Sequence, residues 1–154
     1  MLKQFESLSA DDRQVMMDAI PLVTILIAGA DGKIDHRETL WAEKITRVRS
    51  YDADEQLLPF YKEVGKTFHS RLIDLIDELP EDLNDRQKEV ANRLAKLNDV
   101  FPKVDAFYAR AFYKSLKSFA RHVAKSSGGI LGFLSVSSEE EDWVKLPMLR
   151  EPEV

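Results

Sequence analysis

Three acidic residues around one glycine have the types and spacing needed to bind a cation. They lie in the segment Ala30-Asp31-Gly32-Lys33-Ile34-Asp35-His36-Arg37-Glu38. Gly32 can adopt a positive φ without penalty, so the chain can reverse its direction after Asp31. Asp35 and Glu38 have the spacing of a capping box that begins a helix. The sequence therefore predicts that Asp31, Asp35 and Glu38 converge on one turn.

This segment is similar to the second half of an EF-hand calcium loop, D-G-x-I-x-x-x-E. In that alignment the first two ligand positions fall on Ile27 and Gly29, which have no side-chain oxygen. Calcium takes six to eight oxygens, so half a loop cannot bind it alone. Two interpretations remain. The segment is a capped turn without metal, or it is a site for calcium, manganese or zinc that carboxylates from elsewhere in the chain complete.

A second group of candidate binding residues lies in a basic segment between residues 102 and 125. Five of its cations fall within about 80° of one another on a helix with 100° per residue. They are Arg110, Lys114, Lys117, Arg121 and Lys125. This cationic ridge predicts docking to an acidic protein, a phosphate group or an anionic membrane surface. The alternative is the solvated outer face of a helix that packs through its apolar side.

Other patterns of catalysis or ligation are not found in the sequence. His36, His69 and His122 do not have the H-x-x-x-H or H-E-x-x-H spacing, and we interpret each as a single surface histidine. There is no G-x-S-x-G, and Gly128-Gly129 follows an expected helix, whereas a phosphate-binding glycine loop precedes one. The chain has no cysteine, which excludes disulfides and thiolate metal sites. The sequence therefore predicts no enzymatic activity.

The composition is that of one soluble globular domain. The chain has 154 residues, of which 44% are hydrophobic and 32% charged, and its net charge of −5 does not favour nucleic-acid binding. Its longest apolar run, residues 20–30, is about half the length of the ~20 residues that span a membrane. The N-terminus lacks the charged-then-apolar pattern of a signal peptide. We expect a cytoplasmic protein without a transmembrane segment.

The helices that position these residues are marked by caps, prolines and apolar stripes. Ser9 caps an expected helix that runs to Ala28, and Pro21 predicts a kink or split in it near Ala19. The capping-box spacing of Asn84 and Gln87 predicts the start of a later helix. The other expected elements are residues 35–51, a short element from residue 52, 66–79, 102–125 and 137–146. No segment alternates with period two, so the sequence predicts an all-α, compact bundle of about six or seven helices.

The expected domain spans residues 9–147, after an N-terminal extension at 1–8 and before a flexible tail at 148–154. A shift of 67 residues overlays residues 20–51 on 87–118, with apolar positions in register. Asp31 then matches Asn98, and Glu38 matches Asp105. This internal repeat predicts two similar helical halves, the second with a degraded copy of the acidic turn.

Two motifs together resemble the TerB-like, tellurite-resistance family. One is Ala-Asp-Gly-Lys-Ile-Asp-x-x-Glu from Ala30 to Glu38. The other is Ser126-Ser127-Gly128-Gly129-Ile130-Leu131-Gly132-Phe133, followed by Ser137-Ser138-Glu139-Glu140. The resemblance covers about residues 10–147.

This resemblance implies a compact all-helical fold of two similar halves, with acidic residues at helix ends that bind a divalent metal. It also implies a link to stress responses and to membrane-associated or multi-protein assemblies, without enzymatic activity. Asp31 and Glu38 match the family motif directly, and Asp35 is a helper. Asn98 and Asp105 match it only loosely.

Overall fold

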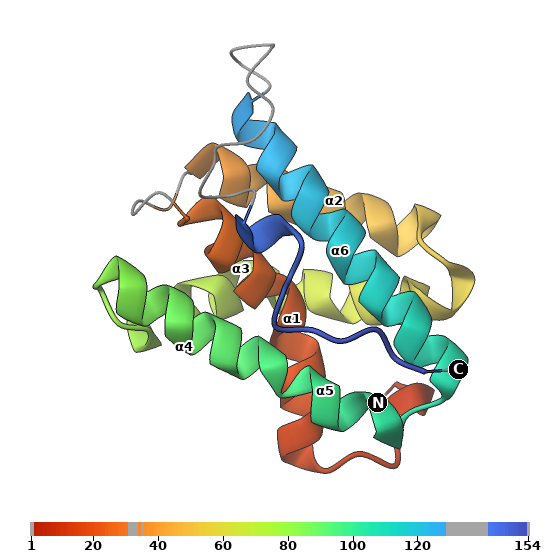
Figure 1. Cartoon of the computed structure of the whole chain (residues 1–154). Coiled ribbons are helices and arrows are strands. Elements are labelled where there is room, and N and C mark those ends of the chain that lie inside the picture. The colour runs from red at the N-terminus through yellow and green to blue at the C-terminus, as the bar shows by residue number, and fades with distance from the viewer. Residues whose placement is uncertain (1, 31–33, 35, 129–141, 154) are drawn as a thin grey trace.

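A computed structural model of the chain describes residues 2–30, 34, 36–128 and 142–153, without the side chains of 36–38, 41, 50–52 and 126–128. The described chain is helical and has no strand, which confirms the all-α prediction. Six α-helices form its bundle (Figure 1): α1 Ala10–Ala28, α2 His36–Asp52, α3 Leu58–Glu78, α4 Leu83–Ala95, α5 Leu97–Val100 and α6 Ala106–Gly128. The short 3-10 helices are η1 Lys3–Phe5, η2 Glu55–Leu57 and η3 Phe101–Lys103.

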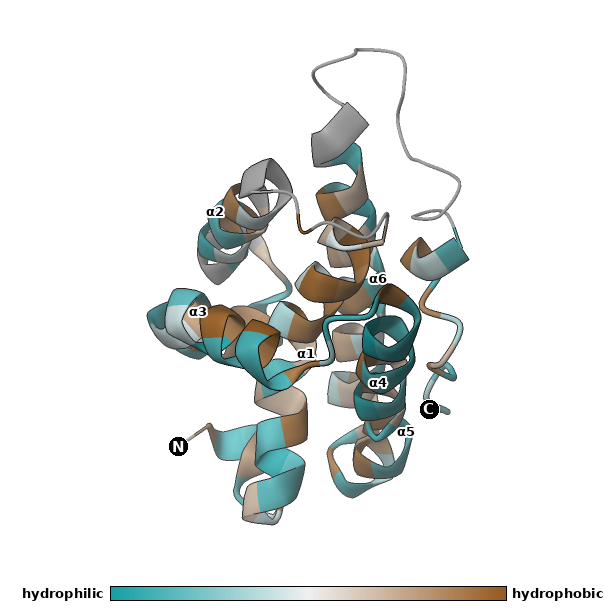
Figure 2. Ribbon diagram, turned by 90° about the vertical axis from the view of Figure 1, so that its left-hand side faces the viewer, coloured by the Kyte–Doolittle hydropathy of each residue, from teal (hydrophilic) through white to brown (hydrophobic). Residues whose placement is uncertain are grey.

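Helix α1 is the centre of the bundle and contacts each of the other five α-helices. Figure 2 shows α2 and α3 on one side of it and α4 and α5 on the other, with hydrophobic residues turned inward. Residues 19–28 of α1 are all buried, as their unbroken apolar sequence predicts. The one hydroxyl among them, on Thr24, donates to the carbonyl of Ile20 at 2.9 Å, so no donor is left unpaired there.

Proline does not divide α1. Helix α1 runs without interruption through Pro21, so the predicted split near Ala19 is wrong. Pro21 has no N–H and removes one bond from the helix ladder. That loss is offset because the residues on both sides of Pro21 are buried against the helices packed around α1, and their burial is available only in the helical conformation.

Glycine does not divide α3 either. The sequence predicted a short element from residue 52 and a separate helix after Gly65, but α3 continues through Gly65 from Leu58 to Glu78. The short element is η2, which ends where α3 begins. A glycine inside a helix costs about 1 kcal/mol relative to alanine, which the burial of Phe60, Val64 and Phe68 outweighs.

The segment before α6 is divided more than expected. The sequence predicts one helix that starts at Asn84, and the structure has α4, α5 and η3 between Asp82 and α6. The cap of α4 is Asp82, which accepts from the Asp85 N–H at 3.0 Å, so the predicted capping box of Asn84 and Gln87 is wrong. Pro102 lies in η3, and α6 begins only after Asp105, whose carboxylate accepts from the Tyr108 N–H at 3.0 Å.

Both chain termini belong to the packed structure. Phe5 and Leu8 are buried in the main core, where the Phe5 ring contacts Phe60 and Tyr108 edge-on, so residues 1–8 are not a separate extension. At the other end, the Asn98 side chain donates to the Met148 carbonyl at 2.8 Å and accepts from the Arg150 N–H at 2.9 Å. Residues 148–150 are therefore held in place, contrary to the predicted flexible tail.

Candidate functional site

The acidic turn connects the end of α1 to the start of α2. Helix α1 ends at Ala28, and the Gly29 N–H donates a hydrogen bond to the Ile25 carbonyl at 2.9 Å. Asp31 and Asp35 lie outside the described residues, and Glu38 is described only as backbone in the first turn of α2. The second motif of the TerB-like resemblance, 126–140, also lies almost wholly outside them. No group of three or more metal-ligating side chains occurs in the part of the chain whose side chains are described.

Two side chains of α4 hold the C-terminal end of α1, just before the acidic turn. Arg86 donates from Nη2 to the Gly29 carbonyl at 2.8 Å, and Gln87 donates from Nε2 to the Leu26 carbonyl at 3.0 Å. Both side chains are buried. The last carbonyls of a helix lack intrahelical partners and carry its negative dipole end, so a guanidinium satisfies them well. A buried positive charge therefore lies at the entrance of the acidic turn, and it opposes the binding of a second cation nearby.

The cationic ridge lies on α6 as predicted, and most of it is in contact with solvent. Arg110, Lys114, Arg121 and Lys125 are exposed, while Lys117 is half-buried over the Tyr113 ring at 5.2 Å from its centroid. Arg110 is 3.5 Å from the Glu151 carboxylate. Among described residues, Lys114, Arg121 and Lys125 have no carboxylate within ion-pair distance.

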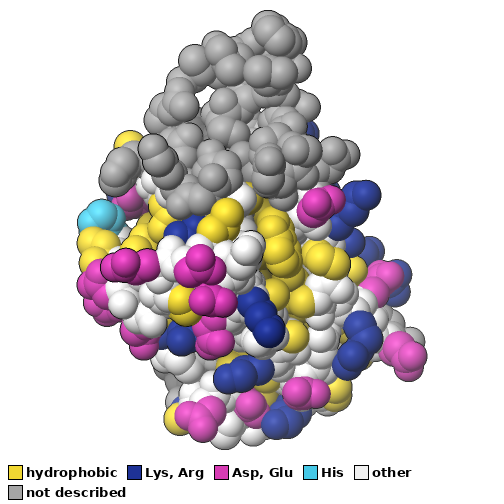
Figure 3. Space-filling model, turned by 60° about the vertical axis from the view of Figure 1, so that its left-hand side comes forward, with side chains coloured by type: hydrophobic (Ala, Val, Ile, Leu, Met, Phe, Trp, Pro, Cys, Tyr) yellow, Lys and Arg dark blue, Asp and Glu magenta, His cyan; other side chains and the backbone are white. Residues whose placement is uncertain are grey.

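A group of exposed acidic residues lies on helices other than α6. It occupies the end of α3 and the start of α4 and comprises Asp74, Asp77, Glu78, Glu81, Asp82 and Asp85. Figure 3 shows a group of acidic side chains on the left of the face turned to the viewer, with others along its lower and right edges. None of these six acids is within ion-pair distance of an α6 cation, and among the described residues only Glu151 pairs with the ridge.

The sequence did not predict a polar cluster beside the ridge, centred on Arg49 of α2. Arg49 donates from Nη1 to Ser115 Oγ at 3.1 Å, and from Nη2 to Ser118 Oγ at 2.8 Å and His122 Nδ1 at 3.3 Å. Its guanidinium also lies 5.7 Å from the centroid of the Tyr61 ring, and the Tyr61 hydroxyl is hydrogen-bonded to Ser115. These residues join α2, α3 and α6.

The environment of the Arg49 cluster is positive. Burial and the charges of Arg49, Lys125 and Arg121 lower the pKa of His122 below its ordinary value of 6.5. Burial also raises the pKa of the Tyr61 hydroxyl. At neutral pH both side chains are therefore uncharged, and the cluster carries the charge of Arg49 alone.

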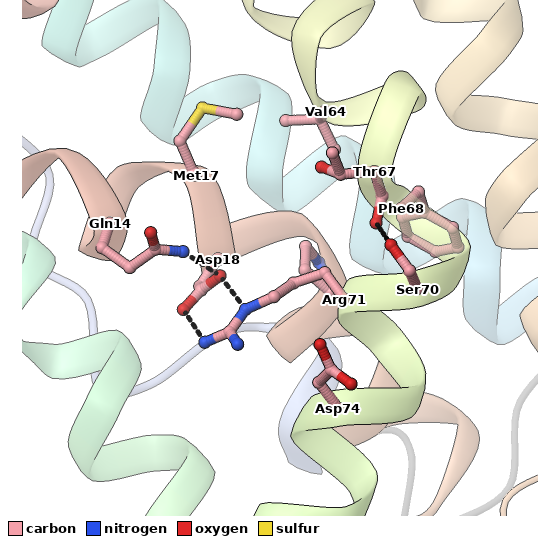
Figure 4. Close-up of a pocket in the computed structure, with 10 residues that line it drawn as sticks. Gln14, Met17, Asp18, Val64, Thr67, Phe68, Ser70, Arg71 and Asp74 are labelled. Atoms are coloured by element: carbon pink, nitrogen blue, oxygen red, sulfur yellow. Dashed lines mark hydrogen bonds and ion pairs between the residues drawn. The ribbon is translucent and has the colours of Figure 1, made fainter.

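A pocket of about 360 Å³ lies between α1 and α3, and Figure 4 shows its polar side. Arg71 binds Asp18 through two hydrogen bonds, Nε to Oδ1 and Nη2 to Oδ2, each 2.8 Å long. Gln14 donates to the same carboxylate at 2.8 Å. The Asp18 carboxylate is thus fully hydrogen-bonded, and it raises the pKa of Arg71. This arrangement ties α1 to α3 and pairs the charges of Asp18 and Arg71 with each other.

None of the helices in the described part of the chain has an apolar stretch that could cross a membrane. Comparisons with protein-family models, with curated proteins and with solved structures found no match.

Proposed function

We propose that this protein is a non-enzymatic, cytoplasmic helical module that docks on an anionic membrane surface through the cationic ridge of α6. The observation that carries this proposal is the charge balance of the ridge. Four of its cations are exposed, and among the described residues only Arg110 has a carboxylate partner, Glu151. Within the described chain, Lys114, Arg121 and Lys125 therefore form an exposed cationic face without an acidic partner, which an anionic surface can supply.

An exposed aromatic residue supports a membrane as that partner. Phe107 lies in the first turn of α6 with 67% of its surface exposed, and at 100° per residue it has about the same direction as Lys125. Each unpaired Lys or Arg near an anionic lipid surface contributes about 1 kcal/mol, and burial of one Phe side chain adds about 2 kcal/mol. The three cations and the Phe side chain together contribute about 5 kcal/mol, which is enough for reversible attachment to a membrane.

Vesicle co-sedimentation tests this proposal. The protein is mixed with phosphatidylcholine vesicles with and without phosphatidylserine, at about 50 mM and about 500 mM salt. Binding should require phosphatidylserine and fall at high salt. It should be lost in the triple variant Lys114→Glu, Arg121→Glu, Lys125→Glu.

The matched control is Lys62→Glu, Lys88→Glu, Lys96→Glu, which changes the net charge equally at three other exposed lysines on α3 and α4 and at the end of α4. This control should retain most of the binding. Binding that is unaffected by salt and by reversal of the ridge would overturn the proposal, as would failure to bind any anionic vesicle.

The acidic turn supports a second candidate function, the binding of a divalent metal. Helix α2 begins at His36, which is the register that a capping box of Asp35 and Glu38 requires, and this register is the same for the turn with and without metal. Thermal unfolding with calcium, manganese or zinc tests it in the wild type and in Asp31→Asn, Glu38→Gln. If none of the three ions raises the Tm of the wild type, the metal hypothesis is wrong. The relation to TerB-like proteins and a role in stress responses stay predictions.

A further inference from the structure

The charge of Arg49 is not compensated within the described chain. Its guanidinium is half-buried and has only neutral partners: two serine hydroxyls, an imidazole and an aromatic ring. Its Nε is buried and has no hydrogen-bond partner. By contrast, the half-buried guanidinium of Arg71 is bound by a carboxylate. Since removing a cation from water is costly without an anion nearby, the Arg49 cluster favours an anionic ligand.

The cluster retains hydrogen-bond donors for that ligand. Arginine can only donate, so Nδ1 of His122 must accept from Arg49, and the imidazole proton is then on Nε2. Ser118 Oγ accepts from Arg49, which leaves its own hydroxyl proton free to donate. Arg49 Nη1 has a second N–H besides the one that it gives to Ser115.

Among the described side chains, the charged groups that act on His122 are all cations. Arg49 faces it from α2, and Arg121 and Lys125 add their charges from α6. The group that α3 contributes, the Tyr61 hydroxyl, is neutral because burial raises its pKa. The position therefore combines a guanidinium, a hydroxyl and an imidazole N–H in a positive field, which is a donor set suited to the oxygens of a phosphate.

We propose that Arg49, Ser118 and His122 bind a terminal phosphate group, either free or on a lipid headgroup, at the edge of the α6 ridge. Binding of a lipid phosphate rests on the proposed membrane docking, whereas binding of free phosphate does not depend on it. A bound phosphate accepts from Ser118, from Arg49 Nη1 and from His122, and its negative charge favours the imidazolium form of His122.

Titration of the histidines by NMR tests this site with inorganic phosphate as the probe. The pKa of His122 should rise by about one unit in phosphate relative to chloride at the same ionic strength, a tenfold gain in proton affinity. His69 on α3 is the internal reference and should not respond. Alanine is compatible with the helix at position 118, so Ser118→Ala should fold and bind phosphate about tenfold more weakly, as judged by the rise in the pKa of His122. Arg49→Gln should abolish this rise.

Vesicles identify the source of the phosphate. Phosphatidic acid, which ends in a phosphate, should bind about tenfold more weakly to Ser118→Ala than to the wild type, while phosphatidylserine, whose phosphate is internal, should bind both equally. A His122 response to inorganic phosphate without preference for phosphatidic acid supports a free phosphate ligand. Loss of vesicle binding alone overturns the membrane proposal and leaves the phosphate site intact. A pKa of His122 that is the same in phosphate and chloride overturns the site itself.

Discussion

Replacement of Gly29 and of Gly65 by alanine should change the stability of the protein in opposite directions. Gly65 lies within α3, and a Cβ placed there meets no atom within 4 Å. Alanine is favoured over glycine in a helix, so Gly65→Ala should stabilise the protein by about 0.5–1 kcal/mol. Gly29 ends α1, and a Cβ placed there lies 2.7 Å from Arg86 Nη2 and 2.9 Å from the Ile25 carbonyl oxygen.

The cost at Gly29 follows from these two contacts. Its φ of −100° is accessible to alanine, so the backbone conformation itself adds no strain. The new methyl group instead displaces Arg86 from the Gly29 carbonyl, and a hydrogen bond to a charged group contributes about 1.5–3 kcal/mol. The gain from fewer unfolded conformations, about 0.5–1 kcal/mol, offsets only part of this loss. Gly29→Ala should therefore destabilise the protein by about 1–2 kcal/mol.

Urea unfolding followed by circular dichroism measures both variants on one scale. At about 2–4 °C per kcal/mol for a chain of this size, thermal unfolding should show a lower Tm for Gly29→Ala and a higher Tm for Gly65→Ala. In the background of Arg86→Met the cost of Gly29→Ala should become smaller, because the displaced guanidinium is absent. A Gly29→Ala variant as stable as the wild type would refute the assigned contact between Arg86 and the end of α1.

Three further predictions concern pairs between distant parts of the chain. Arg71→Met leaves the buried Asp18 carboxylate without its guanidinium and should lower the free energy of unfolding by about 3 kcal/mol, measured in urea; a change below about 0.5 kcal/mol would contradict the pairing. Asn98→Ala removes both hydrogen bonds to residues 148 and 150, so trypsin should cleave after Lys145 and Arg150 faster than in the wild type, and an unchanged cleavage rate would contradict this anchoring. Because the pKa of folded His122 lies below its unfolded value of 6.5, the unfolded chain binds more protons, and stability should fall as the pH decreases below about 6.5; His122→Gln should reduce that slope, and an equal slope in both proteins would refute the assigned shift.

The fold was predictable where one helix face is apolar over many turns. The stripe of Tyr108, Phe112 and Phe119 in α6 and the unbroken apolar run of α1 are both buried as expected. The predicted breaks at Pro21 and Gly65 were wrong because each costs only a few kcal/mol locally, and burial of the flanking residues exceeds that cost. Local signals set helix boundaries only where tertiary packing does not oppose them.

Of the two candidate sites, the sequence predicted one and missed the other. The α6 ridge was predictable because its cations share one helix face and depend on no other element. The Arg49 cluster was not, because its hydroxyl and imidazole partners follow 66 to 73 residues later, and no local pattern links an arginine to Ser115, Ser118 and His122. His122 was interpreted as a single surface histidine for that reason. The one available signal was the spacing of Ser115, Ser118 and His122, which fall on adjacent turns of one helix beside the cations.

The central position of α1 determines how the molecule unfolds. Because residues 19–28 are enclosed by α2 to α6, separation of any of these helices should expose part of α1. The backbone amides of Leu22 to Ile27 should therefore exchange with solvent only when the whole bundle opens, at a rate set by global unfolding. The bundle should therefore unfold as one cooperative unit, and its slowest-exchanging amides should belong to α1.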